Sequence, residues 1–129
     1  MKESGRLNVR VYTSQAQIPV EGATVAVTGE GEGGKRRLYS IQKTDRSGEI
    51  QPVSIDTPDK AGSISPGTAQ PYTQVDVWAE SPGFALLVIE GVQVFPGVDT
   101  FQAMELNPLE EGRTSLNTTQ VRRIPEQTL

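Results

Sequence analysis

The chain has 129 residues, of which 35% are hydrophobic but only 5% aromatic, and its formal net charge is −4. It contains no histidine and no cysteine, which excludes disulfides, imidazole or thiolate metal sites and the commonest general base of enzymes. The negative charge argues against nucleic acid as a partner, and the lack of a signal peptide or of an apolar run of about 18 residues predicts no membrane span.

Alternating apolar residues predict short β-strands in the first half of the chain. In the first of these, Leu7, Val9 and Val11 alternate with polar side chains. On this pattern we expect strands at residues 6–13, 23–27, 38–43 and 50–55.

Two short segments combine turn residues with the start of a strand. Residues 18–25 read Ile-Pro-Val-Glu-Gly-Ala-Thr-Val, and residues 44–50 read Thr-Asp-Arg-Ser-Gly-Glu-Ile. An aspartate can accept hydrogen bonds from the backbone of its own turn, and glycine tolerates a positive φ. We therefore predict that Asp45 caps a corner and that Gly48 takes a positive φ there.

The second half continues in the same way after a segment, residues 57–71, that is rich in proline and glycine and predicts a long surface loop. Further strands are expected at residues 74–80, 84–89, 91–97 and 100–106. No segment has helical periodicity bounded by caps. About seven short strands predict an all-β sandwich over residues 1–109, followed by a polar tail or linker at 110–129.

The order of these segments resembles the carboxypeptidase regulatory-like, transthyretin-like modules, which pair a "pxxGAxVxV" stretch with a "TDxxGxf" turn. The corner at residues 81–84, Ser-Pro-Gly-Phe, and the closing residues 104–108, Met-Glu-Leu-Asn-Pro, extend the resemblance over residues 5–109. It implies a seven-stranded Greek-key β-sandwich of the prealbumin/transthyretin type. Such modules usually scaffold or bind, and rarely catalyse.

A narrower similarity concerns residues 92–98, Val-Gln-Val-Phe-Pro-Gly-Val, and residues 121–125, Val-Arg-Arg-Ile-Pro. These look like the N-terminal region of clostridial proteins labelled spore cortex-lytic or peptidoglycan-binding. The similarity implies a cell-envelope or spore setting outside the cytoplasm, and it transfers no catalytic residue.

Trp78 is the sole tryptophan and is the first candidate binding residue. The alternation in residues 74–80 places it on the face opposite Val75, Val77 and Ala79. An outward Trp78 beside Tyr72 would form a platform for a cell-wall glycan or peptide, or for a protein. The alternative is that Trp78 covers the sheet edge or packs beneath the 57–71 loop.

Six consecutive apolar residues at 84–89 are more than one face of a strand needs. If Phe84, Leu86 and Val88 fill the core, then Ala85, Leu87 and Ile89 face outward and form a surface for self-association or for a neighbouring domain. The alternative is a β-bulge that turns both sets inward.

No cluster of acids has the dense spacing of a calcium loop, and the glycines at residues 29–34 precede a strand instead of opening a phosphate-binding helix. We therefore expect no metal, no cofactor and no catalytic residue. The sequence predicts a non-catalytic structural or protein-interaction module, with a binding module for a cell-wall glycan or peptide as the alternative.

Overall fold

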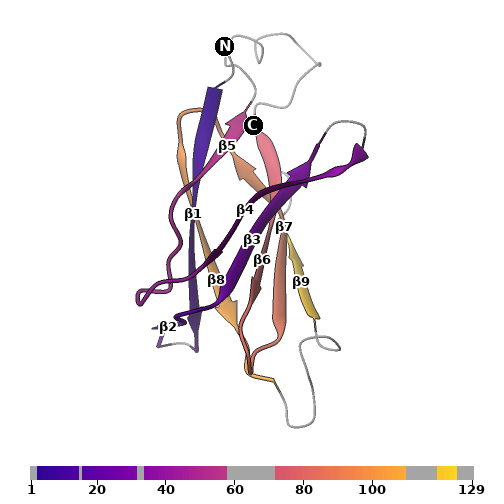
Figure 1. Cartoon of the computed structure of the whole chain (residues 1–129). Helices are drawn as coiled ribbons and strands as arrows, with labels where there is room; N and C mark the ends of the chain where they lie inside the picture. Colours follow the sequence, from indigo (N-terminus) through magenta and orange to yellow (C-terminus); the bar gives the residue numbers. More distant parts are fainter. Residues whose placement is uncertain (1–2, 15, 32–33, 58–71, 110–118, 125–129) are drawn as a thin grey trace.

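The computed structural model describes residues 3–14, 16–31, 34–57, 72–109 and 119–124, and these form an all-β sandwich of two sheets (Figure 1). The predicted all-β class is therefore confirmed. Within the described residues nine strands are assigned: β1 (Glu3–Thr13), β2 (Ile18–Pro19), β3 (Thr24–Glu30), β4 (Arg36–Lys43), β5 (Val53–Thr57), β6 (Thr73–Glu80), β7 (Leu86–Val94), β8 (Asp99–Leu106) and β9 (Thr119–Arg123).

One sheet has four strands and is built around β1, which pairs antiparallel with β2 and β5 and parallel with β8. Arg6 of β1 donates to the Asp99 carboxylate of β8 at 2.7 Å. This hydrogen bond raises the pKa of the Arg6 guanidinium. The pair joins the two strands at the surface, where ion pairs contribute little stability.

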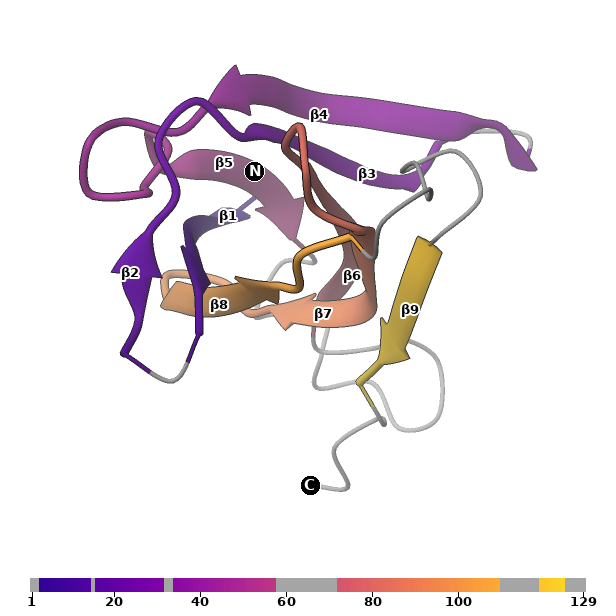
Figure 2. The same ribbon diagram turned by 90° about the horizontal axis from the view of Figure 1, so that it is seen from below.

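The second sheet has five strands in the order β4-β3-β6-β7-β9. Figure 2 shows β3 and β4 in one layer and β1 and β5 in the other. The side chains between the layers are mostly β-branched, as the low aromatic content predicted. Those that are most deeply buried include Leu7, Val9, Val11, Val25, Val27, Ile55, Val75, Val77, Met104 and Leu106.

Both predicted turn segments meet at one corner of the sandwich. Thr44 is buried, and its hydroxyl accepts a hydrogen bond from the Ala23 N–H at 2.9 Å and donates one to the Val20 carbonyl at 2.6 Å. In the adjoining turn the Asp45 carboxylate accepts from the backbone N–H groups of Ser47 and Glu49. Gly48 has a φ of 75°. The predictions for Asp45 and Gly48 are confirmed.

Replacing Thr44 by valine keeps the shape of the side chain but removes the hydroxyl that joins the two segments. The Ala23 N–H and the Val20 carbonyl then lose a partner in a buried place, which costs about 1–3 kcal/mol. We expect the free energy of unfolding in urea to fall by that amount. The matched control, Thr44→Ser, keeps the hydroxyl and should lose less than half as much; equal losses would contradict this role of the hydroxyl.

The strands predicted at residues 84–89 and 91–97 are parts of one continuous strand, β7, which is shorter at both ends than the two ranges together. Gly91 lies within it with a φ of 79°, opposite a register shift in β6 between Val75 and Val77. Asp76, at the shift, accepts the Gly91 N–H at 3.1 Å. A β-bulge of this kind lets the two strands stay paired on both sides of the irregularity.

The C-terminal part of the chain contributes to the sandwich. Thr119–Arg123, within the predicted tail, form β9 and pair in parallel with Leu86–Glu90 of β7. The predicted boundary at residue 109 therefore separates two parts that share a sheet. Two of the eight predicted strand ranges join in β7, which leaves seven strands, and β9 and the two-residue β2 bring the number within the described residues to nine. Most of the predicted 57–71 loop lies outside the described residues.

Candidate functional site

Trp78 lies in the middle of the five-stranded sheet, on β6, and points away from the core. Val75, Val77 and Ala79 are buried on the inner face, while 37% of the Trp78 surface is exposed. The prediction of an outward Trp78 is therefore confirmed. Its indole Nε1–H donates to the Thr28 hydroxyl oxygen at 2.9 Å, which holds the ring over β3.

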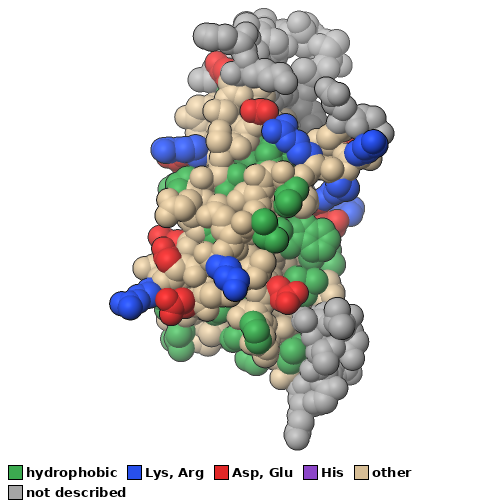
Figure 3. Space-filling model, viewed as in Figure 1, with side chains coloured by type: hydrophobic (Ala, Val, Ile, Leu, Met, Phe, Trp, Pro, Cys, Tyr) green, Lys and Arg blue, Asp and Glu red, His purple; other side chains and the backbone are tan. Residues whose placement is uncertain are grey.

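Trp78 belongs to a row of apolar side chains that crosses all five strands. The strand registers pair Ile41 with Ala26, Ala26 with Trp78, Trp78 with Val88 and Val88 with Val121. The ends of the row are open to solvent, with Ile41 61% and Val121 59% exposed, whereas Val88 is buried. We call these five residues the apolar row. Figure 3 shows hydrophobic side chains gathered on this side of the molecule.

A polar network borders the apolar row and fixes its geometry. Arg36 of β4 donates to the Asp76 carboxylate at 2.5 Å and to the Thr28 hydroxyl oxygen at 3.0 Å. The Asp76 carboxylate also accepts a hydrogen bond from the Gly91 N–H. This one carboxylate on β6 therefore bonds to both β4 and β7. Because Thr28 accepts from both Arg36 and Trp78, the ring position is set by groups on three strands.

A shallow hollow of about 240 Å³ adjoins the Trp78 ring. It lies where the small outward side chains of β3 adjoin the larger ones of β6 and β7. Apolar groups and hydrogen-bonding groups both reach it, which suits an amphipathic ligand or a protein side chain. Its lining is Thr24, Ala26, Thr28, Trp78, Glu80 and Leu86.

Tyr72 takes no part in this surface. Its side chain is buried, and its ring packs against Phe95 with 5.3 Å between the ring centroids. Six residues of a strand span about 20 Å, so Tyr72 and Trp78 lie far apart along β6. The predicted platform of adjacent Trp78 and Tyr72 is wrong.

The outward assignment of Ala85, Leu87 and Ile89 is also wrong, because all three are buried. Leu87 pairs with Ala79 of β6, and Ile89 pairs with Val77, and both partners face the core. The opposite set, Leu86 and Val88, lies on the outer face instead. The run therefore has a second apolar face, formed by Leu86 and Val88, whereas Phe84 packs against the core as predicted.

Within the described residues, the sequence-based interpretation missed six exposed large apolar residues, and three of them, Ile41, Val121 and Phe101, lie beside the two hollows or at the ends of the apolar row. Ile41 and Val121 form the two ends of the apolar row, and each sits on an edge strand whose face is set by pairing. The third, Phe101, is 77% exposed on β8 of the other sheet. Met104 and Leu106, two residues apart on β8, are both buried. Continued back along the strand, this alternation places Phe101 on the outer face, and it is visible in the sequence.

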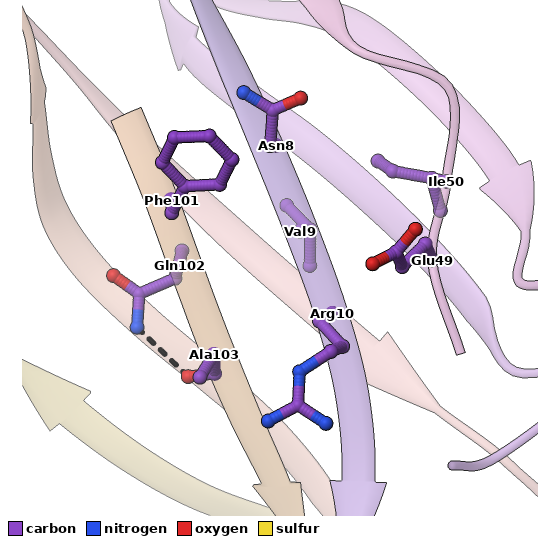
Figure 4. A pocket seen from close by; sticks show the side chains of 8 residues that line it. All are labelled: Asn8, Val9, Arg10, Glu49, Ile50, Phe101, Gln102 and Ala103. Atoms are coloured by element: carbon purple, nitrogen blue, oxygen red, sulfur yellow. Dashed lines mark hydrogen bonds between the residues drawn. The ribbon is translucent and has the colours of Figure 1, made fainter. Parts of the chain in front are cut away.

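A second hollow, of about 300 Å³, lies beside Phe101 on the outer face of the four-stranded sheet (Figure 4). It runs over β1, with Phe101 on one side and Glu49 on the other. Arg10 reaches it but also donates to the Gln17 side-chain oxygen at 2.7 Å and packs against the Tyr12 ring. Of the two charged groups at this hollow, Arg10 therefore already has partners, and Glu49 is exposed to solvent.

The described part of the chain contains no group of three or more His, Cys, Asp or Glu side chains placed to hold a metal ion. Nor is any of its segments a helix of the length and hydropathy needed to cross a bilayer.

No known protein family and no curated protein matches this sequence. Solved structures do match the fold. The catechol 1,2 dioxygenase of Acinetobacter radioresistens aligns over 95% of this chain with a TM-score of 0.58 and 15% identity. A 9R-lipoxygenase from Cyanothece aligns over 86% with a TM-score of 0.51 and 13% identity.

This chain spans 57% of the dioxygenase and 18% of the lipoxygenase. At such identities the likeness shows the fold alone, since one β-sandwich fold carries many unrelated functions.

Proposed function

We propose that this chain is a non-catalytic β-sandwich module that acts in assembly, by protein contact through the outer face of its five-stranded sheet. The observation that carries the proposal is the apolar row, which crosses the whole sheet and is open to solvent at both ends. Contiguous apolar surface on a soluble domain typically marks an interaction site. We infer no catalytic role.

We place the module among the carboxypeptidase regulatory-like, transthyretin-like sandwiches of cell-wall or spore-associated proteins outside the cytoplasm. The turn at Thr44, Asp45 and Gly48 supports the family, because its sequence matches the "TDxxGxf" pattern and it forms a capped turn with a positive φ at the glycine. The second segment with the clostridial similarity lies close to the start of the first: residues 121–123 of β9 pair with residues 88–90 of β7, and the Ile124 N–H donates to the Glu90 carbonyl at 2.9 Å.

A second candidate function is binding of a cell-wall glycan or peptide at Trp78. The observation in its favour is the hollow beside the ring, where Thr24, Thr28 and Glu80 offer hydrogen-bonding groups next to an aromatic surface. This site uses the middle of the sheet and does not need the exposed ends of the apolar row.

Acrylamide quenching of the sole tryptophan separates the two functions. If the face binds protein, quenching of Trp78 fluorescence falls as the chain is concentrated, or when the chain is tested within a longer gene product. Soluble peptidoglycan fragments should then leave the quenching unchanged. The variant Ile41→Ser with Val121→Ser should restore quenching, because it removes the exposed ends of the row. The matched control is Val98→Ser, which changes an exposed apolar residue outside the row.

A different result is that peptidoglycan fragments protect Trp78 from quenching both in the wild type and in the double serine variant. That result would contradict the assembly role and favour glycan or peptide binding. Protection only within the complete gene product would assign the face to an adjoining domain. Unchanged quenching in all samples would contradict any contact at this face.

A further inference from the structure

The hollow beside Phe101 lies where the pairing of β1 is irregular. The register leaves five residues, 49–53, opposite the four residues 7–10 of β1. An extra residue of this kind is a β-bulge, and it bends one strand away from its partner. The Gln42 side chain holds the bulged segment, because it accepts the Gln51 N–H at 3.0 Å and donates to the Gln51 carbonyl at 3.1 Å. The hollow of about 300 Å³ is therefore a built feature of the sheet.

Two opposite charges line this hollow without forming an ion pair. Arg10 and Glu49 lie directly opposite each other in the register. Opposite charges at such positions usually attract each other. The Arg10 guanidinium instead donates to the Gln17 side-chain oxygen at 2.7 Å and lies 4.8 Å from the centre of the Tyr12 ring. The Glu49 carboxylate has no ion-pair or hydrogen-bond partner among the described residues.

The remaining charged groups around this face do not line the hollow. Arg6 and Asp99 pair with each other beyond Phe101. The Asp45 carboxylate accepts two backbone N–H groups of its own turn. Glu105 lies opposite Tyr12, two residues past Ala103 on β8. The hollow itself therefore presents one positive and one negative group, held apart.

Phe101 supplies an apolar wall for the same hollow. It is 77% exposed and pairs with Asn8, next to the pair formed by Arg10 and the small Ala103. Figure 4 shows the ring on one side of β1 and the Glu49 carboxylate on the other, with the Arg10 guanidinium turned away from Glu49. A ligand in the hollow thus meets a ring, a carboxylate and a guanidinium.

We propose that this hollow binds a free α-amino acid with a large apolar side chain. The ammonium group of the ligand contacts Glu49, its carboxylate contacts Arg10, and its side chain packs on the Phe101 ring. Arg10 can bind the carboxylate while it is bonded to Gln17, because a guanidinium has five N–H donors. The volume is at the lower end of small-molecule sites, which suits a single amino acid. This site is separate from the face of the proposed function.

The two unjoined charges favour a zwitterion over other ligands. A ligand that is only anionic or only cationic would satisfy one group and be repelled by the other. A neutral sugar would leave both groups without an ionic partner, and a residue inside a polypeptide has neither a free ammonium nor a free carboxylate. An α-amino acid carries both charges on one carbon and its apolar part on the same carbon.

The expected affinity is weak, because the hollow is open to solvent and exposed ion pairs contribute little. We expect a Kd of about 1–10 mM for leucine, which is typical of a small ligand with few contacts. Added salt should weaken binding further, since it screens both charges.

A titration with leucine, followed by the amide NMR signals of the labelled chain, tests the proposal. The signals of Arg10, Glu49 and Phe101 should shift and saturate. N-acetyl-leucine lacks the ammonium and leucinamide lacks the carboxylate, so each should bind about fivefold more weakly than leucine. Glycine, which has both charges but no apolar side chain, should also bind more weakly.

Two variants assign each charge of the ligand to its partner. In Glu49→Gln the ammonium has lost its partner, so leucine and N-acetyl-leucine should bind equally. In Arg10→Gln the carboxylate has lost its partner, so leucine and leucinamide should bind equally. A merely structural role of either residue would weaken all ligands alike and would not remove one discrimination while keeping the other.

Phe101→Ser should lower the affinity for leucine to that for glycine and leave glycine binding unchanged. Glu105→Gln and Leu38→Ser are matched controls, since they change a charge on the same sheet and an exposed apolar residue on the other sheet. Both should keep the wild-type affinities. Circular dichroism checks that every variant is folded.

Three outcomes would overturn the proposal. The first is the absence of saturable shifts at up to about 100 mM leucine, which is well above the expected Kd. The second is equal affinity of the wild type for leucine and for both analogues, which would exclude recognition of the charges. The third is a set of shifts centred on Trp78 and its sheet, which would place amino-acid binding elsewhere. The first two outcomes leave the assembly role untouched, because it concerns the other sheet.

Discussion

Replacing Gly48 by alanine is expected to remove a large part of the stability of the sandwich. Gly48 has a φ of 75°, a region that costs an ordinary residue about 1–2 kcal/mol. An added Cβ would also overlap the Val11 carbonyl oxygen and press on the Val20 nitrogen. Forcing extra atoms into a packed place typically costs a further 1–3 kcal/mol or so.

The overlap arises because the turn is tied closely to β1. The Val11 N–H donates to the Gly48 carbonyl at 2.7 Å, and the Ile50 N–H donates to the Val9 carbonyl at 3.3 Å. The turn can therefore move away from β1 only by breaking these bonds. We expect a loss of about 3 kcal/mol or more in urea unfolding, which is a large part of the stability of a domain of this size.

Gly83→Ala is the matched control for this prediction. Gly83 also has a positive φ, 86°, but an added Cβ would meet nothing within 4 Å. It should therefore lose only the cost of the backbone conformation. Equal losses in the two variants would show that the close approach to Val11 has no energetic effect.

The corners were predictable from the sequence because their chemistry is local. A glycine that needs a positive φ and an aspartate that caps its own turn act within five residues, so the pattern Thr-Asp-Arg-Ser-Gly carries its own geometry. The outward direction of Trp78 was predictable for the same reason, since the strict alternation of residues 74–80 marks both faces of β6.

The apolar row was not predictable, because it depends on strand register. Ile41 and Val121 are distant in the sequence and become parts of one row only through the pairing of β4 with β3 and of β9 with β7. The strand β9 has five residues, which is too short to show a clear period, and most of its residues are polar. Parallel pairing with a remote strand leaves no local signal of the kind that a hairpin leaves.

The run of residues 84–89 shows the limit of alternation as a guide. All six side chains are apolar, so the sequence offers no polar residue to mark the outer face. The register with β6 resolves the ambiguity, since Leu87 opposite Ala79 and Ile89 opposite Val77 share the inner face. A single shift by one residue exchanges every side chain between the faces.

The double variant Leu87→Glu with Ile89→Lys tests that register directly, and we expect it not to fold. Both side chains are buried, at 2% and 3% exposure, and pack within the main core. An ionised group without a partner in an apolar core costs several kcal/mol even after relaxation, so two such groups exceed the roughly 5–15 kcal/mol of a typical domain. Circular dichroism should show no cooperative unfolding.

The neighbouring substitution Leu86→Glu is the matched control, because Leu86 directly precedes Leu87 in the sequence but lies on the outer face beside Trp78. It should remain folded and lose about 1 kcal/mol or less, as expected for a half-exposed position. Folding of the double variant together with unfolding of Leu86→Glu would place the core on the other side of β7. That result would remove Val88 from the apolar row and with it the continuous surface on which the assembly role rests.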